Sequence, residues 1–187
     1  MAGRLALVAA LGIAASCSDP TPTALTLPGA FERVASAIDA ADAKRLYWDL
    51  DLEARWSLMS IHRSQKRARR LVNGAYPPEE RERATGRWTV GAEARTPGEL
   101  FAILCARDDC MEPLRAKIGA AARIERTADG GVVHTIRGGT YRFTKGADGR
   151  YGLVGFADRL AALKLEVARD LEVIERTALS YRGSKGR

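Results

Sequence analysis

The stretch 121-AARIERTADGGVVHTIRGGTYRFTKGADGRYGLV-154 decides the fold class of this chain. Its alternating apolar and polar runs are separated by three turn signals, Asp129-Gly130-Gly131, Gly138-Gly139 and Asp148-Gly149. Turns of this composition between β-forming runs join neighbouring antiparallel strands. The stretch therefore predicts a four-stranded antiparallel meander, with Ile124, Tyr141 and Phe143 on its core face.

A long amphipathic helix is expected directly after the meander. Its apolar residues follow one another at intervals of 3, 4, 4, 3, 4 and 3, namely Leu160, Leu163, Val167, Leu171, Ile174, Ala178 and Tyr181. This is the spacing of one helix face. Because helical patterns fill the chain before residue 120 and strands do not alternate with helices, the sequence predicts an α+β fold.

The helical half contains one long expected helix and several short ones. A short helix is expected over Ala43 to Leu50, and the long one runs from Asp51 as its cap to about Asn73, with Gly74 as its stop. Its apolar positions are Leu52, Trp56, Met59, Leu58, Ile61 and Val72. Thr96-Pro97-Gly98-Glu99 is a capping box that opens a further helix through Ala106.

The first residues have the composition of a secretory signal. Arg4 precedes the uncharged apolar run Leu5 to Ala15, and the small residue Ser16 then leads to Cys17. Eleven apolar residues extend about 16 Å as a helix, which is half the thickness of a bilayer's hydrocarbon core. The run is therefore too short for a permanent membrane span.

The residues Ala14-Ala15-Ser16-Cys17 resemble the lipobox of bacterial lipoproteins, although Leu is more usual than Ala at position 14. The resemblance implies cleavage before Cys17 and acylation of Cys17. Because Ser18 and not Asp follows the cysteine, it also implies an anchor on the periplasmic face of the outer membrane. An ordinary cleaved signal peptide, with Cys17 as an unmodified or paired thiol, is the alternative.

The expected organisation has a single folded domain. Residues 1–16 are the signal peptide, and residues 17–27 are an extended tether because Pro20 and Pro22 oppose helix. The α+β domain covers residues 28–181, and residues 182–187 are expected to be a disordered tail.

Cys105 and Cys110 are the remaining cysteines. An exported chain favours a disulfide between them. On a continuous helix their side chains would point about 140° apart, so the bond requires the helix to break near Asp108-Asp109. Two thiols without suitably spaced histidines do not make a structural zinc site, and no metal or cofactor is predicted.

The chain carries a formal net charge of +7, and its densest basic run lies in the long helix. Arg63, Lys66, Arg67 and Arg70 share one helix face and are candidates for binding anions. For an exported protein we expect anionic envelope components or another envelope protein as partners, and no nucleic acid. The alternative is a solvated face paired with Glu79, Glu80 and Glu82.

The sequence predicts no catalytic set. It lacks a G-x-S-x-G elbow and an H-E-x-x-H pair, so an enzyme would need His62 or His134 beside a carboxylate in a cleft. The aromatic residues of the first half either anchor the core or line a ligand pocket: Tyr47, Trp48, Trp56, Tyr76 and Trp88.

The stretch 37-AIDAADAKRLYWDLD-51 together with the late sheet resembles the arrangement of the NTF2-like fold. This chain departs from the usual pattern of that fold because it ends in a long helix. The predicted function is a membrane-anchored envelope lipoprotein with a non-catalytic interaction or structural role. Small-ligand binding on a concave sheet, which the resemblance implies, is the alternative.

Overall fold

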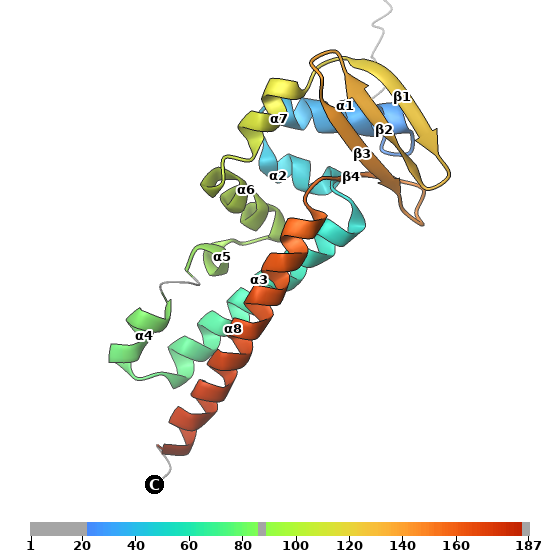
Figure 1. Ribbon diagram of the computed structural model, residues 1–187. Helices are drawn as coiled ribbons and strands as arrows, with labels where there is room; N and C mark the ends of the chain where they lie inside the picture. The colour runs from blue at the N-terminus through green and yellow to red at the C-terminus, as the bar shows by residue number, and fades with distance from the viewer. Residues whose placement is uncertain (1–21, 86–88, 185–187) are drawn as a thin grey trace, which may run out of the picture.

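A four-stranded sheet lies at one end of the molecule, and two long helices extend from it side by side (Figure 1). The computed structural model describes residues 22–85 and 89–184. We call the sheet with the helices around it the head, and the two long helices the arm. The fold is α+β, as the sequence predicts.

The elements follow one another in the predicted order of helices, meander and closing helix. Before the sheet lie α1 (Leu27–Asp39), α2 (Ala43–Leu46), the 3-10 turn η1 (Tyr47–Asp49), α3 (Leu52–Ala75), α4 (Pro78–Thr85), α5 (Thr89–Glu93), α6 (Pro97–Arg107) and α7 (Met111–Lys117). The sheet and the last helix are β1 (Ala121–Thr127), β2 (Gly130–Thr135), β3 (Thr140–Lys145), β4 (Tyr151–Val154) and α8 (Ala157–Ser184).

The sheet is the expected antiparallel meander in the order β1-β2-β3-β4. Tyr141 and Phe143 are buried on its inner face, and Ile124 is half-buried beside them. Helix α1 covers this face, where the ring of Phe31 lies 5.9 Å from that of Tyr141. The other face carries polar side chains of β1, β2 and β3, which is the usual alternation in a sheet with one solvated face.

The packed part of the chain begins before Pro28. The hydroxyl of Thr26 accepts a hydrogen bond from the amide of Gly29 and caps α1. Ala24 is buried, and its carbonyl accepts a hydrogen bond of 2.8 Å from the amide of Tyr151. At the other end α8 continues to Ser184, so residues 182–184 of the expected disordered tail are helical.

The helices α3 and α8 run parallel. Both start at the head, where the amide of Asp51 donates to the carbonyl of Leu153. Further along the arm, Arg67 and Glu175 form an ion pair. At the far end the ring of Tyr76 lies 5.0 Å from that of Tyr181. Apart from Ser57, the buried residues of α3 recur at alternating intervals of four and three, as in a coiled coil: Ala54, Leu58, Ile61, Gln65, Ala68, Val72 and Ala75.

Two expectations for α3 were wrong. The helix passes through Gly74 and ends at Ala75, because Pro77 and Pro78 stop the chain more firmly than a glycine does. Leu52, Trp56 and Met59 are exposed and do not join the core. They lie on the side of the helix opposite its buried face.

The expected helix over residues 43–50 is divided into α2 and the 3-10 turn η1. Asp42 caps α2 by accepting a hydrogen bond of 2.9 Å from the amide of Arg45. None of the helices within the described ranges is long and apolar enough to cross a membrane.

Candidate functional site

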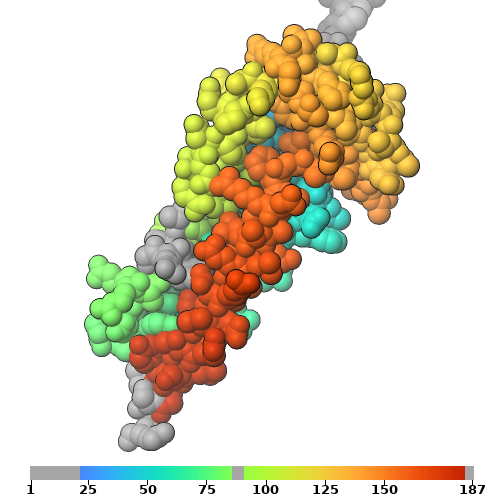
Figure 2. Space-filling model, viewed as in Figure 1, coloured from blue at the N-terminus to red at the C-terminus, as the bar shows by residue number. Residues whose placement is uncertain are grey.

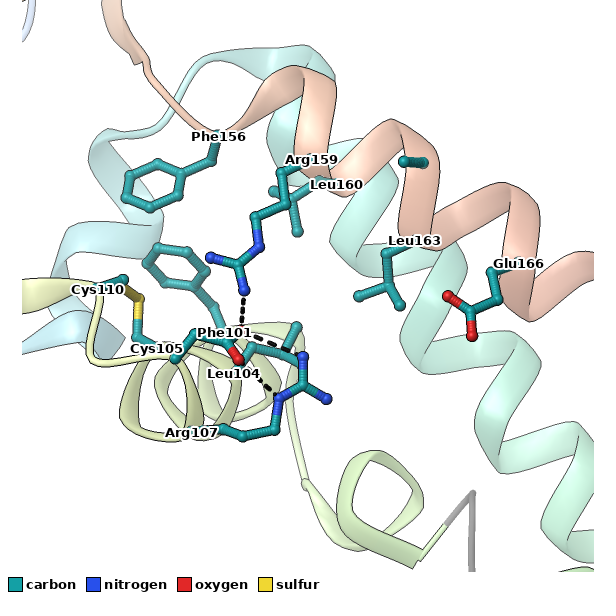
Figure 3. A pocket seen from close by; sticks show the side chains of 12 residues that line it. Phe101, Leu104, Cys105, Arg107, Cys110, Phe156, Arg159, Leu160, Leu163 and Glu166 are labelled. Carbon is teal, nitrogen blue, oxygen red and sulfur yellow. Dashed lines mark hydrogen bonds and ion pairs between the residues drawn. A yellow bond between two sulfur atoms is a disulfide. The ribbon is translucent and has the colours of Figure 1, made fainter.

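A cavity of about 280 Å³ lies where α6, the turn after it and the start of α8 meet (Figure 3). We call it the α6–α8 pocket. Its apolar lining comes from Phe101 and Leu104 on α6 and from Phe156, Leu160 and Leu163 at and after the entry to α8. The rings of Phe101 and Phe156 meet edge to face with centroids 5.1 Å apart, which closes one end of the cavity.

Local sequence positions the α6 wall of the pocket. The hydroxyl of Thr96 accepts a hydrogen bond of 3.2 Å from the amide of Glu99, and Pro97 fits the first turn. The carboxylate of Glu99 accepts a bond of 2.7 Å from the amide of Arg95, one residue before the cap, and pairs with Lys44 at 2.9 Å. These contacts fix the start of α6 against α2.

A disulfide between Cys105 and Cys110 forms the second wall, with Cα atoms 4.8 Å apart. The helix breaks after Arg107, and Asp109 adopts a left-handed backbone with φ of 47°. Aspartate is one of the residues that tolerates this conformation. The break lies at the position that the cysteine spacing requires.

Asp108 joins the two sides of the pocket rim. Its carboxylate accepts hydrogen bonds of 2.9 and 3.1 Å from Arg107 and a further hydrogen bond from Arg159 on α8. The hydrogen bond from Arg107 is the main cause that holds the pKa of Asp108 below its usual range, and Arg159 lowers that pKa further. Asp108 is therefore ionised at neutral pH and bound to two guanidinium groups.

This arrangement is suited to binding. The floor is formed by apolar side chains, while the two arginine charges are balanced by Asp108 and by Glu166 at the rim. The sulfur atoms are bonded to each other, so neither is a thiolate nucleophile. The pocket therefore fits a small uncharged molecule better than an anion.

The predicted basic residues lie on the arm and not at this pocket. Arg63, Arg67 and Arg70 are exposed on α3, and Lys66 is half-buried. Arg67 pairs at 2.7 Å with Glu175 of α8, and not with the glutamates of α4. For the other three, no ion pair is formed within the part of the chain that the structure describes.

The five aromatic residues of the first half do not form one pocket. Tyr47 is buried near α6, and Tyr76 is buried at the far end of the arm. Trp48 and Trp56 are exposed, and Trp88 lies outside the described residues. The concave aromatic pocket of the alternative hypothesis is therefore not assembled from these side chains.

The two histidines occupy different surroundings. His62 Nε2 lies 2.8 Å from the carbonyl of Ala94. His134 Nε2 lies 3.1 Å from Glu125 Oε1 on the solvated face of the sheet, where Arg123 also binds that carboxylate. The hydrogen bond from Arg123 is the main cause that lowers the pKa of Glu125. This pair lies on an open strand surface and not in a cleft.

Sequence reasoning missed the α6–α8 pocket. Phe101, Phe156 and Arg159 have no spacing or motif that connects them, and only the packing of α8 against α6 brings them together. Among residues 22–85 and 89–184, no three side chains of His, Cys, Asp or Glu are grouped to hold a metal ion.

Comparisons of the chain with known family models, with curated proteins and with solved structures gave no match. Cys17, the predicted lipidation site, lies outside the described residues.

Proposed function

We propose that this chain is a lipid-anchored envelope protein with a non-catalytic interaction role. The observation that carries the proposal is the order of the N-terminal sequence, in which Arg4, an apolar run and Ala14-Ala15-Ser16 lead to Cys17. Ala24, seven positions after Cys17, is buried in the folded part. A protein of this design is held close to the membrane surface, where its arm is available to partners.

The shape of the molecule and its charge support an interaction role. The arm extends away from the head (Figure 1), and the exposed side of α3 presents Arg63, Lys66 and Arg70 without carboxylate partners among the described residues. Anionic envelope components are the partners that this charge favours. We place the anchor on the periplasmic face of the outer membrane because Ser18 follows the cysteine.

The test is the intact mass of the protein purified from bacterial membranes, compared with a Cys17→Ala variant. We expect a mature chain that begins at Cys17 and carries acyl mass, and a variant that lacks this mass. An unmodified wild-type chain recovered in the soluble fraction would reject the anchor. A matched Cys110→Ala variant, which removes a different cysteine, should keep the acyl mass.

A second candidate function is binding of a small apolar molecule in the α6–α8 pocket. The observation that favours it is the preformed cavity floored by Phe101, Phe156 and Leu163. Benzene and indole are suitable probes, and we expect them to raise the melting temperature of the wild type. Leu163→Phe, which fills the cavity, should abolish this rise, and Leu179→Phe at an exposed position of α8 should not. A rise that survives Leu163→Phe would reject the pocket as the site.

A further inference from the structure

Exposed apolar side chains gather where α3 and α8 leave the head. The exposed fractions are 61% for Trp48, 44% for Leu52, 57% for Trp56, 37% for Met59 and 59% for Leu165. Leu52, Trp56 and Leu165 line one hollow between the two helices, and Trp48 and Leu52 line the next. We call these five residues the apolar patch. In Figure 2 the first turns of α3 emerge in cyan beside the start of α8, below the sheet.

The apolar patch continues into a row of cations on the same side of α3. Successive residues of a helix are turned by about 100° around its axis. On this measure Leu52, Trp56, Met59 and the cations of this row share one side of the helix, a sector of about 100° opposite the buried face. We call Arg63, Lys66, Arg67 and Arg70 the basic row. From Leu52 to Arg70, the part of the patch that belongs to α3 and the basic row extend about 27 Å along this helix.

This combination matches the chemistry of an anionic lipid surface. Leucine and tryptophan side chains enter the boundary between headgroups and acyl chains, and lysine and arginine bind the phosphates beside them. Neither indole N–H of Trp48 or Trp56 has a hydrogen-bond partner among the described residues, so both remain available at that boundary. The basic row is aligned with the apolar patch and not on the opposite side of the arm.

The point at which the chain enters the head supports the same orientation. Ala24 is bonded to Tyr151, and Tyr151 lines the hollow that contains Trp48 and Leu52. Ala24 follows Cys17 by seven positions, and a chain of this length spans at most about 25 Å. If Cys17 carries the lipid, Ala24 is held within this distance of the bilayer, at the strand whose Tyr151 lines the hollow with Trp48 and Leu52. This step rests on the proposed function.

We infer that the apolar patch and the basic row form a surface that lies on anionic phospholipid headgroups, with Trp48 and Trp56 at the depth of the upper acyl chains. The arm then rests along the membrane, and the outer face of the sheet and the α6–α8 pocket are left for other contacts.

The test measures quenching of tryptophan emission by lipids with brominated acyl chains. Full-length protein purified from membranes is reconstituted into vesicles of phosphatidylcholine with increasing phosphatidylglycerol. We expect quenching that grows with phosphatidylglycerol content. A Trp48→Phe/Trp56→Phe variant, in which only Trp88 emits, should lose most of it. Quenching that stays in this variant, or that is absent from anchored wild-type protein, would overturn the inference and leave the lipid anchor intact.

The basic row is tested separately from the patch. Arg63→Gln/Arg70→Gln should shift the equilibrium between the membrane-bound and the free state of this surface about 30-fold toward the free state. Each removed cation lowers the equilibrium constant for binding to the anionic bilayer about fivefold. Arg126→Gln/Arg137→Gln removes two exposed cations of the head and serves as the matched control. Equal quenching with and without phosphatidylglycerol would overturn the role of anionic headgroups.

Two outcomes separate this inference from the proposed function. If mass spectrometry finds no acyl group, the same vesicles are added to the soluble protein. Quenching of Trp48 and Trp56 then still supports the proposed lipid-binding surface. The absence of quenching overturns it. Sedimentation of the protein without vesicles tests a second copy as the occupant. A dimer that Trp56→Glu dissociates would overturn the lipid assignment.

Discussion

The backbone amide of Asp51 donates a hydrogen bond of 3.0 Å to the carbonyl of Leu153. This bond joins the residue that caps α3 to the last strand of the sheet, two elements that are distant in sequence. Leu50 and Leu153 form a parallel bridge at the same place. The start of the arm is therefore fixed to the edge of the head by main-chain contacts.

Gly152 allows this close approach. A Cβ atom at position 152 would lie 2.5 Å from the Cα of Asp51 and 2.8 Å from the carbonyl oxygen of Leu50. Both are backbone atoms, so a side chain forces the strand and α3 apart. We expect Gly152→Ala to lower the free energy of unfolding by about 2 kcal/mol, measured by urea denaturation.

Gly155 provides the matched control for this substitution. A Cβ atom there would meet nothing within 4 Å, so Gly155→Ala should leave the free energy of unfolding within about 0.5 kcal/mol of the wild type. Equal effects of the two substitutions would show that the approach at Gly152 is not the cause.

Asp51 itself is a buried cap whose charge opposes burial. Its side chain accepts a hydrogen bond of 3.3 Å from the amide of Ala54, while burial, the largest cause, raises the pKa of Asp51. Asp51→Asn keeps the acceptor and removes the charge, so it should be at least as stable as the wild type at neutral pH. Asp51→Ala loses the cap and should cost about 1 kcal/mol.

The pH dependence checks the cause. A raised pKa in the folded state means that the ionised form of Asp51 is disfavoured by folding. The wild type therefore gains stability relative to Asp51→Asn as the pH falls through the folded-state pKa toward the usual aspartate value. Urea denaturation of both proteins at pH 7 and at about pH 4 measures this change. A difference between them that does not change with pH would contradict the desolvation argument.

The sheet and the closing helix were predictable because their signals are local. The turns at Gly130, Gly138 and Gly149 have positive φ, which glycine adopts without strain. The break between Cys105 and Cys110 was also deducible, because the spacing of two cysteines limits how a helix can connect them.

The exposed side of α3 was not predictable from spacing. Leu52, Trp56 and Met59 recur at helical intervals, and so do Leu58 and Ile61 on the other side. The side that is buried is decided by elements later in the chain: α5, α6 and above all α8, which pairs with α3 from more than eighty residues away. The resemblance to the NTF2-like fold and the lipid on Cys17 stay predictions.

The disulfide should stabilise the fold through the short loop that it closes. A loop of this length corresponds to about 2 kcal/mol in the chain-entropy model. We expect dithiothreitol to lower the free energy of unfolding of the wild type by this amount in urea denaturation. In a Cys105→Ala/Cys110→Ala variant the same reagent should have no effect. An equal loss in both would assign the effect to the reductant and not to this bond.

The contact of Asp108 with Arg107 and Arg159 should make the closure of the α6–α8 pocket sensitive to acid. Because the pKa of Asp108 is lowered in the folded state, its contribution is complete above the usual aspartate pKa and disappears as the pH falls through the lowered value. Asp108→Asn should therefore lower the urea midpoint at neutral pH and have a smaller effect at about pH 3.

Asp109→Asn is the control, since Asp109 is exposed and its left-handed backbone accepts asparagine. It should leave the midpoint unchanged at both pH values. Arg159→Gln should cause part of the neutral-pH loss of Asp108→Asn, since Arg107 stays bound to Asp108. The two substitutions together should cost less than their sum because both remove the ion pair between Asp108 and Arg159. Additive effects would mean that Arg159 stabilises α8 by another contact, and that the rim of the pocket is not held by Asp108.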